Sequence, residues 1–130
     1  MIVLDTHALV WWVEGGKLSQ AAATAIADEQ PDGEILVSSI TAWELALLVR
    51  RGRLRLALDV SDWLAAVGRV RAVRYVPVDN KIALASVALP DSFDSDPADR
   101  IIVATARSLG AALVTADDKI RGYPHIRTVW

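Results

Sequence analysis

The chain has 130 residues, no cysteine and a formal net charge of −2 at pH 7. This length predicts one domain with its own core, and the lack of cysteine excludes disulfides, thiolate nucleophiles and zinc fingers. No apolar run reaches the roughly 18 residues needed to span a bilayer, and the opening MIVLD has no basic lead-in typical of a signal peptide. We therefore expect a soluble, cytoplasmic protein without membrane contacts.

Strand and helix signals alternate along the whole chain. In chain order they predict a strand at 2–4, helices at 7–14 and 18–29, a strand at 35–39, helices at 41–51 and 61–68, a strand at 73–78, helices at 80–89 and 97–109, and strands at 111–115 and 126–130. The strands are continuously apolar rather than alternating, which indicates a mainly parallel sheet covered by helices on both faces. The predicted fold is α/β, with a single domain over residues 1–130.

Four acidic residues are expected at the carboxyl edge of this sheet. Asp5 directly follows the first strand, Asp117 comes two residues after another, and Glu44 and Asp99 lie in the first turns of predicted helices. Ligands of open parallel sheets bind at this edge. Carboxylates gathered there repel one another unless a proton or a cation intervenes. A hard divalent cation such as Mg²⁺ or Mn²⁺ is the natural partner for oxygen ligands.

Helix capping is the alternative interpretation of these acids, because helix N-termini favour carboxylates. Asp96, directly before a proline, is expected to cap the helix at 97–109, which puts Asp99 at the capping-box position. Thr41 and Glu44 show the same Thr-x-x-Glu spacing. For these positions taken singly, capping competes with a functional role.

Two further acids have neighbours that could perform the capping. Thr6 could cap the first helix in place of Asp5, and Asp118 could cap the last one in place of Asp117. If these neighbours form the caps, capping would not account for the acids that follow the core strands, and a functional role would explain them better. Capping explains each acid by itself, but it does not explain why every expected strand exit carries one.

Four segments together carry a resemblance to a known family. They are VLDTHALVWW (3–12), VSSITAWELALLVRRGRL (37–54), DPADRIIVATARSLGAALVTAD (96–117) and the terminal Trp130. In this order and spacing they resemble PIN-domain ribonucleases of the VapC toxin type, over nearly the whole chain. By position, the resemblance places the family's acidic cluster on Asp5, Glu44, Asp99 and Asp117.

The resemblance implies hydrolysis of RNA phosphodiesters with Mg²⁺ as cofactor, for which Mn²⁺ could substitute. Asp5, Asp99 and Asp117 would hold the metal, and Glu44 would complete the coordination sphere or orient the attacking water. The expected products carry a 5′-phosphate and a 3′-hydroxyl. The substrate would be tRNA, rRNA or mRNA. Independently of the family, such chemistry needs no nucleophilic side chain, because the cation activates the water.

The resemblance also implies biological partners. A VapC-type toxin inhibits translation or growth when free, is held inactive by a VapB-type antitoxin, and forms homodimers. The helix segment 42–49 has Glu44 as its only charged residue, which indicates cover on more than one side, such as a dimer would provide. Trp11 and Trp12 point about 100° apart on a helix. One core face cannot easily bury both, which leaves one for a partner.

Several neighbouring residues extend or vary the family pattern. Asp96 is an additional candidate for the acidic cluster, and Thr6 and Thr115 are candidates to support it with their hydroxyls. Members of this subgroup often have a histidine two residues before the Asp-Pro pair, where this chain has Asp94. This departure leaves the positioning of substrate open.

The arginines are concentrated in one part of the chain. Seven lie between Arg50 and Arg74. They are candidates to contact RNA phosphates beside the acidic site, or to form a solvated face with ordinary ion pairs.

The sequence is also compatible in part with two other function classes. A phospho-acceptor signalling domain has a similar length and sheet. It needs an additional acid beside Asp5, an acceptor aspartate at the end of a middle strand and a lysine late in the chain. This sequence has none of these residues in a suitable position. A non-catalytic PIN-like module that binds RNA or a partner remains the alternative.

Overall fold

The computed structural model describes all 130 residues. Its elements in chain order are β1 (Ile2–Leu4), α1 (Thr6–Glu14), α2 (Gln20–Glu29), β2 (Ile35–Ser38), α3 (Ile40–Arg50), α4 (Val60–Gly68), β3 (Val73–Val76), α5 (Asn80–Val87), α6 (Pro97–Leu109), β4 (Ala112–Val114), α7 (Asp118–Arg121) and β5 (Thr128–Val129). Every element expected from the sequence is present, with ends shifted by at most two residues. No helix has the length and apolar character needed to cross a membrane.

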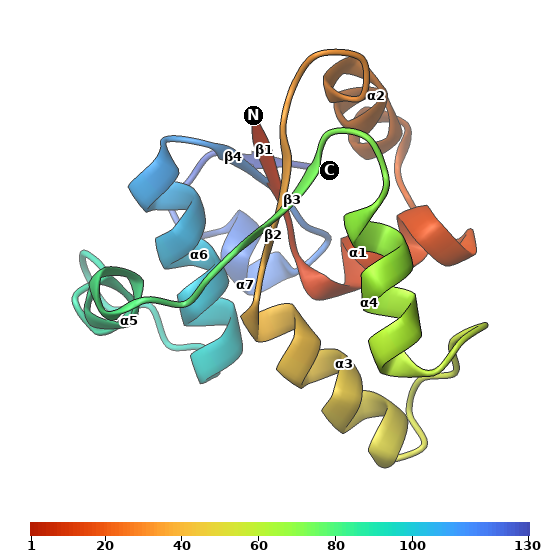
Figure 1. Ribbon diagram of the computed structural model, residues 1–130. Coiled ribbons are helices and arrows are strands. Elements are labelled where there is room, and N and C mark those ends of the chain that lie inside the picture. Colours follow the sequence, from red (N-terminus) through yellow and green to blue (C-terminus); the bar gives the residue numbers. More distant parts are fainter.

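The five strands form one fully parallel sheet in the order β3-β2-β1-β4-β5 (Figure 1). The chain winds outward from β1 through β2 to β3, and then returns through α5 and α6 to place β4 on the other side of β1. The winding direction thus reverses between β1 and β4. In open parallel sheets, ligands bind outside the carboxyl ends of the strands at such a reversal.

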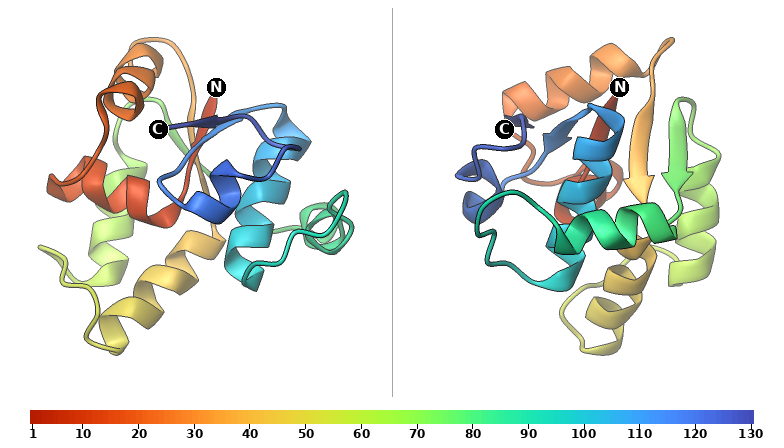
Figure 2. Two further views of the ribbon diagram at one scale, coloured as in Figure 1. Left: turned by 180° about the vertical axis from the view of Figure 1, so that it is seen from behind. Right: turned by 90° about the vertical axis from the view of Figure 1, so that its left-hand side faces the viewer.

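Both faces of the sheet are buried, which confirms the α/β prediction. Along β1, Ile2 and Leu4 belong to one apolar cluster and Val3 to the other. Figures 1 and 2 show α1, α2 and α4 covering one face, and α5 and α6 covering the opposite face. Successive strand residues therefore pack into two different cores, one on each face of the sheet. For this reason the strands are apolar at every position rather than alternately apolar and polar.

The boundaries of α6 follow the signals in its sequence. The Asp96 side chain accepts a hydrogen bond from the backbone N–H of Asp99 at 2.9 Å, and Pro97 occupies the first helical position. At the other end, Gly110 adopts a left-handed conformation with φ of 65°, which a residue without Cβ adopts at little cost. The predicted capping role of Asp96 is confirmed.

Candidate active site

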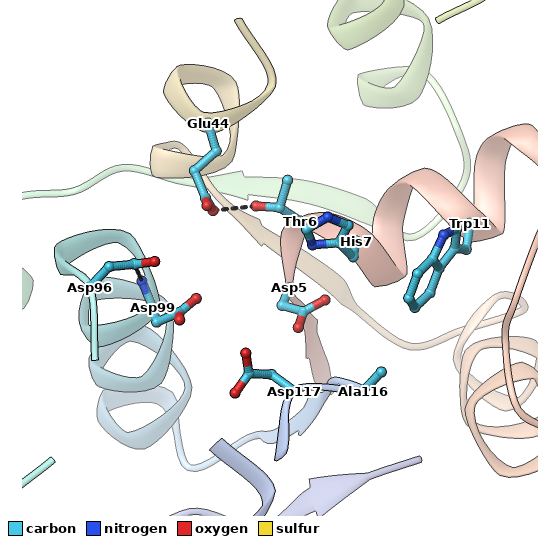
Figure 3. A pocket seen from close by; sticks show the side chains of 9 residues that line it. All are labelled: Asp5, Thr6, His7, Trp11, Glu44, Asp96, Asp99, Ala116 and Asp117. Carbon is cyan, nitrogen blue, oxygen red and sulfur yellow. Dashed lines mark hydrogen bonds between the residues drawn. The ribbon is translucent and has the colours of Figure 1, made fainter. Parts of the chain in front are cut away.

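A pocket of about 400 Å³ lies at the carboxyl ends of β1 and β4 (Figure 3). Its volume falls within the range of small-ligand sites. All four acids singled out in the sequence line it, together with five other residues. The complete lining is Asp5, Thr6, His7, Trp11, Glu44, Asp96, Asp99, Ala116 and Asp117.

Asp5 is buried at the centre of this pocket, with 7% of its surface exposed. It caps α1 itself, because its Oδ1 accepts from Ala8 N at 2.9 Å, so the suggestion that Thr6 takes this role is wrong. Its Oδ2 accepts a hydrogen bond from the Thr115 hydroxyl. Burial raises the pKa of Asp5, although these two hydrogen bonds oppose the shift. Each oxygen retains a second lone pair, so capping does not exclude a cation.

Glu44 is held by a chain of hydroxyls. Its Oε1 accepts from Thr6 Oγ1 at 2.5 Å, and Thr6 Oγ1 lies 3.1 Å from Thr41 Oγ1. Because the one hydroxyl hydrogen of Thr6 goes to Glu44, Thr41 must donate to Thr6. Burial raises the pKa of Glu44, and the hydrogen bond from Thr6 opposes the shift.

The predicted capping box at Thr41 and Glu44 is wrong. Helix α3 begins one residue before Thr41, and its N-cap is Ser39, which makes no side-chain capping bond. Glu44 therefore lies in the second turn of α3 rather than the first. Its carboxylate bonds to a residue of α1 instead of the start of its own helix.

Asp99 turns its carboxylate toward the pocket from the first turn of α6 (Figure 3). Its Oδ2 accepts from the Ser95 hydroxyl at 2.8 Å. Burial raises the pKa of Asp99 to about 6, and the neighbouring charges of Asp96, Asp117 and Asp5 add to this effect.

Asp117 caps α7 and is linked to Asp5 through one threonine. Its Oδ1 accepts from Ile120 N at 3.1 Å, so the suggestion that Asp118 provides this cap is wrong. The backbone N–H of Asp117 donates to Thr115 Oγ1 at 3.0 Å. Since the Thr115 hydroxyl donates to Asp5 in turn, it ties the ends of β1 and β4 together.

The donor chemistry of the pocket fits a hard divalent cation. Five carboxylates and no thiol line it, and Mg²⁺ and Mn²⁺ prefer such oxygen ligands. No three histidine, aspartate or glutamate side chains stand close enough to form a ready metal site. Mutual repulsion favours this separation of unneutralised carboxylates. Coordination of one cation by several of these carboxylates would require their side chains to move closer together.

Other residues discussed from the sequence lie outside the acidic cluster. Asp94, in place of the usual histidine, is exposed and does not line the pocket. His125 pairs with Asp91 at 2.6 Å. Arg74 and Arg71 form surface ion pairs with Glu34 and Asp32, at 2.8 and 3.9 Å. For these two arginines, the ion pairs favour the solvated-face interpretation.

Comparison with known proteins agrees with this architecture. The PIN domain family model matches residues 2–126. The chain belongs to the PIN-domain family. This PIN domain is 43% identical to Ribonuclease VapC22 of Mycobacterium tuberculosis over 132 residues, which cover 99% of the chain and 98% of the relative. Its resemblance to the VapC type is thereby confirmed.

Solved structures share the fold at lower identity. VapBC2 from Rickettsia felis, bound to a DNA fragment from its promoter, has a TM-score of 0.71 at 18% identity, over 98% of this PIN domain and 97% of that chain. VapC20 of Mycobacterium tuberculosis, described as a Sarcin-Ricin loop cleaving toxin, has a TM-score of 0.63 at 19% identity, over 98% and 99%. At such identities the likeness shows the fold alone.

Three residues of this PIN-domain site were missed or given another role by sequence reasoning. Ser95 supports Asp99, and only its spacing of four residues from that acid could have suggested the contact. Thr41 completes the hydroxyl chain to Glu44 but was assigned to a cap. Trp11 lines the pocket, whereas its sequence pattern left its surroundings open.

Proposed function

We propose that this PIN domain is a metal-dependent endoribonuclease that hydrolyses RNA phosphodiesters, with Mg²⁺ as cofactor and Mn²⁺ as a substitute. The observation that carries the proposal is the gathering of five carboxylates in one pocket at the reversal between β1 and β4. The curated relative at 43% identity is a ribonuclease, which supports the same reaction class.

The contacts of the pocket residues support the following roles. Asp5, Asp99 and Asp117 would provide the oxygen ligands, and the Thr115 hydroxyl would keep Asp5 in register with the end of β4. A bound divalent cation supplies Lewis acidity that activates water and neutralises charge on the phosphate. Glu44, fixed by Thr6, would orient the attacking water. The products would carry a 5′-phosphate and a 3′-hydroxyl.

We also propose that this nuclease is the toxin of a toxin–antitoxin pair in the cytoplasm. Free toxin would inhibit translation or growth by cutting tRNA, rRNA or mRNA, and a VapB-type antitoxin would hold it inactive. Support comes from the relative VapC22 and from structural neighbours described as VapBC assemblies, including those from Rickettsia felis and Salmonella typhimurium.

Exposed apolar side chains support a homodimer as the working form. Leu84 and Val87, three residues apart on α5, are 72% and 76% exposed, and Trp43 on α3 is 57% exposed. Large apolar side chains that stay exposed can mark a protein interface. We propose that α3 and α5 contribute to the contact with a second copy.

The function is tested by incubating the purified, antitoxin-free chain with total RNA in Mg²⁺ or in EDTA. We expect cleavage only with Mg²⁺, its loss in Asp5→Asn and in Asp117→Asn, and its retention in the control Asp94→Asn. Sequencing of the fragments should show 5′-phosphate ends. Cleavage that persists in EDTA or in both variants would contradict the proposed mechanism.

A non-catalytic RNA-binding module is the second candidate, because no three side chains form a ready metal site. Binding of Mn²⁺, followed by electron paramagnetic resonance, separates the two. Saturable binding that an Asp5→Asn, Asp99→Asn double variant abolishes supports the nuclease. Equal behaviour of both proteins, with RNA bound but never cut, supports the binding module.

A further inference from the structure

We propose that Trp11 is a stacking platform for a nucleobase of the substrate, next to the acids that act on the phosphate. This inference rests on the proposed function as a ribonuclease and deepens it, because it assigns a residue to substrate recognition. The assignment follows from the position of Trp11 in the pocket, from what supports its ring, and from its free indole N–H.

The pocket has an acidic part and an apolar part. Of its nine lining residues, Trp11 and Ala116 are the hydrophobic ones. Figure 3 shows Trp11 and Ala116 on one side of Asp5, and Asp96 and Asp99 on the other. A nucleotide offers the same two chemistries, a phosphate and an apolar base face, so one nucleotide can satisfy both parts at once.

The Trp11 ring is braced from several directions. Its centroid lies 5.5 Å from that of Trp130 and 5.7 Å from that of His7, at interplanar angles of 51° and 46°. His7 and Trp11 are four residues apart on α1 and therefore share one face of the helix. A Cβ at Gly16 would lie 2.8 Å from Trp11 Cδ1, so the absence of a side chain there makes room for the indole.

The surroundings of Trp11 differ from those of Trp63, which packs in the hydrophobic core. Trp63 is buried and donates its indole N–H to Glu14 at 3.1 Å. The indole nitrogen of Trp11 has no partner in the chain, and no buried side-chain nitrogen or oxygen lacks one, so this group is open to solvent. A ring that is braced behind and open toward a pocket is suited to contact a ligand.

Stacking on such a ring suits single-stranded RNA. Unpaired bases stack on aromatic side chains, and this contact tolerates different sequences because every base has a flat π-face. A base held on Trp11 would hold its adjoining phosphate near Asp5. The expected preference is therefore for nucleotides in loops or single strands, with the base unstacked from its neighbours.

The test compares a base-containing RNA with the same backbone lacking bases. Fluorescein-labelled rA10 and a decamer of abasic ribose phosphates are titrated by fluorescence anisotropy, all in an Asp99→Asn background that we expect not to cleave. We expect Trp11→Ala to weaken rA10 binding by at least about fivefold and to leave binding of the abasic decamer unchanged. Trp11→Phe should recover most of the loss.

Gly16→Ala provides an independent perturbation that keeps the indole. Its new methyl group would displace the ring, so we expect a smaller loss on rA10 and none on the abasic decamer. An equal loss on both ligands would show a merely structural role and overturn the proposal, as would no loss on either. If the wild type fails to cleave RNA but Trp11→Ala still weakens binding of rA10 and not of the abasic decamer, only the nuclease proposal is contradicted.

Discussion

Replacement of Asp99 by asparagine should stabilise the metal-free protein at pH 8. Burial raises the pKa of this carboxyl from 3.8 to about 6, so folding disfavours its charged form. A difference of about 2.2 pKa units corresponds to about 3 kcal/mol. The side chain is partly exposed, and solvent screening reduces the expected gain to about 1–2 kcal/mol. The asparagine oxygen can still accept the hydrogen bond from Ser95.

The sign of the pH dependence follows from the direction of the pKa shift. The destabilisation by Asp99 is complete above the folded pKa of about 6 and disappears below the unfolded value near 3.8. Between pH 8 and pH 5, the stability difference between variant and wild type should fall by about half. Added Mg²⁺ should stabilise the wild type, because the cation replaces the missing proton, but should stabilise the variant less.

Urea unfolding measures this difference. With an m-value of about 1–3 kcal/mol/M, the midpoint at pH 8 should rise by roughly 0.3–2 M in Asp99→Asn. Asp94→Asn removes the same charge from an exposed position in the preceding loop and should change the free energy of unfolding by less than about 0.5 kcal/mol. A less stable Asp99→Asn protein at pH 8 would refute the reasoning, because the carboxylate would then stabilise α6 through the helix dipole.

Two further changes test the hydroxyl support and the dimer. Thr115→Val removes the donor to Asp5 and should lower the free energy of unfolding by about 1–3 kcal/mol. In the matched control Thr105→Val, a buried threonine loses only a hydrogen bond to its own helix. Urea unfolding should therefore show a smaller loss of stability for Thr105→Val than for Thr115→Val. The double variant Leu84→Glu, Val87→Glu changes two exposed residues and should yield folded monomers in light scattering of size-separated protein.

Each of these outcomes has a clear opposite. Equal losses in the two threonine variants would mean that the contact with Asp5 adds nothing beyond an ordinary buried hydroxyl. A wild-type protein that is monomeric at the concentrations used, or a dimer that persists in the double variant, would contradict the proposed α3 and α5 contact.

Much of the fold could be predicted because its signals are local. Pro97 and Gly110 limit α6 through their own backbone preferences, and apolar strands separated by helices indicate a parallel sheet. Asp5 directly follows β1, and Asp117 follows β4 closely. Both acids could therefore be placed at the carboxyl edge of the sheet from local signals alone. These inferences need only the position of a residue relative to its own element.

Capping assignments failed where a local pattern competed with a distant partner. Thr6 is an alternative cap for α1 by sequence, yet Asp5 caps this helix with one oxygen and accepts from Thr115 with the other. Glu44 fits a capping box by spacing, but its partner is Thr6. One carboxylate can serve both purposes because it has two oxygens with several lone pairs, which spacing alone does not reveal.

The elements, the parallel sheet and the edge on which the acids lie can all be inferred from the sequence, because they depend on backbone preference and on the burial of apolar runs. By contrast, the three-dimensional arrangement of the chain is needed to know which hydroxyl donates to which acid and where Trp11 lies. Thr115 and Asp5 are 110 residues apart, and Trp11 rests on Trp130 from the far end of the chain. Such contacts depend on distances and directions that arise only when β1, β4 and β5 pair side by side.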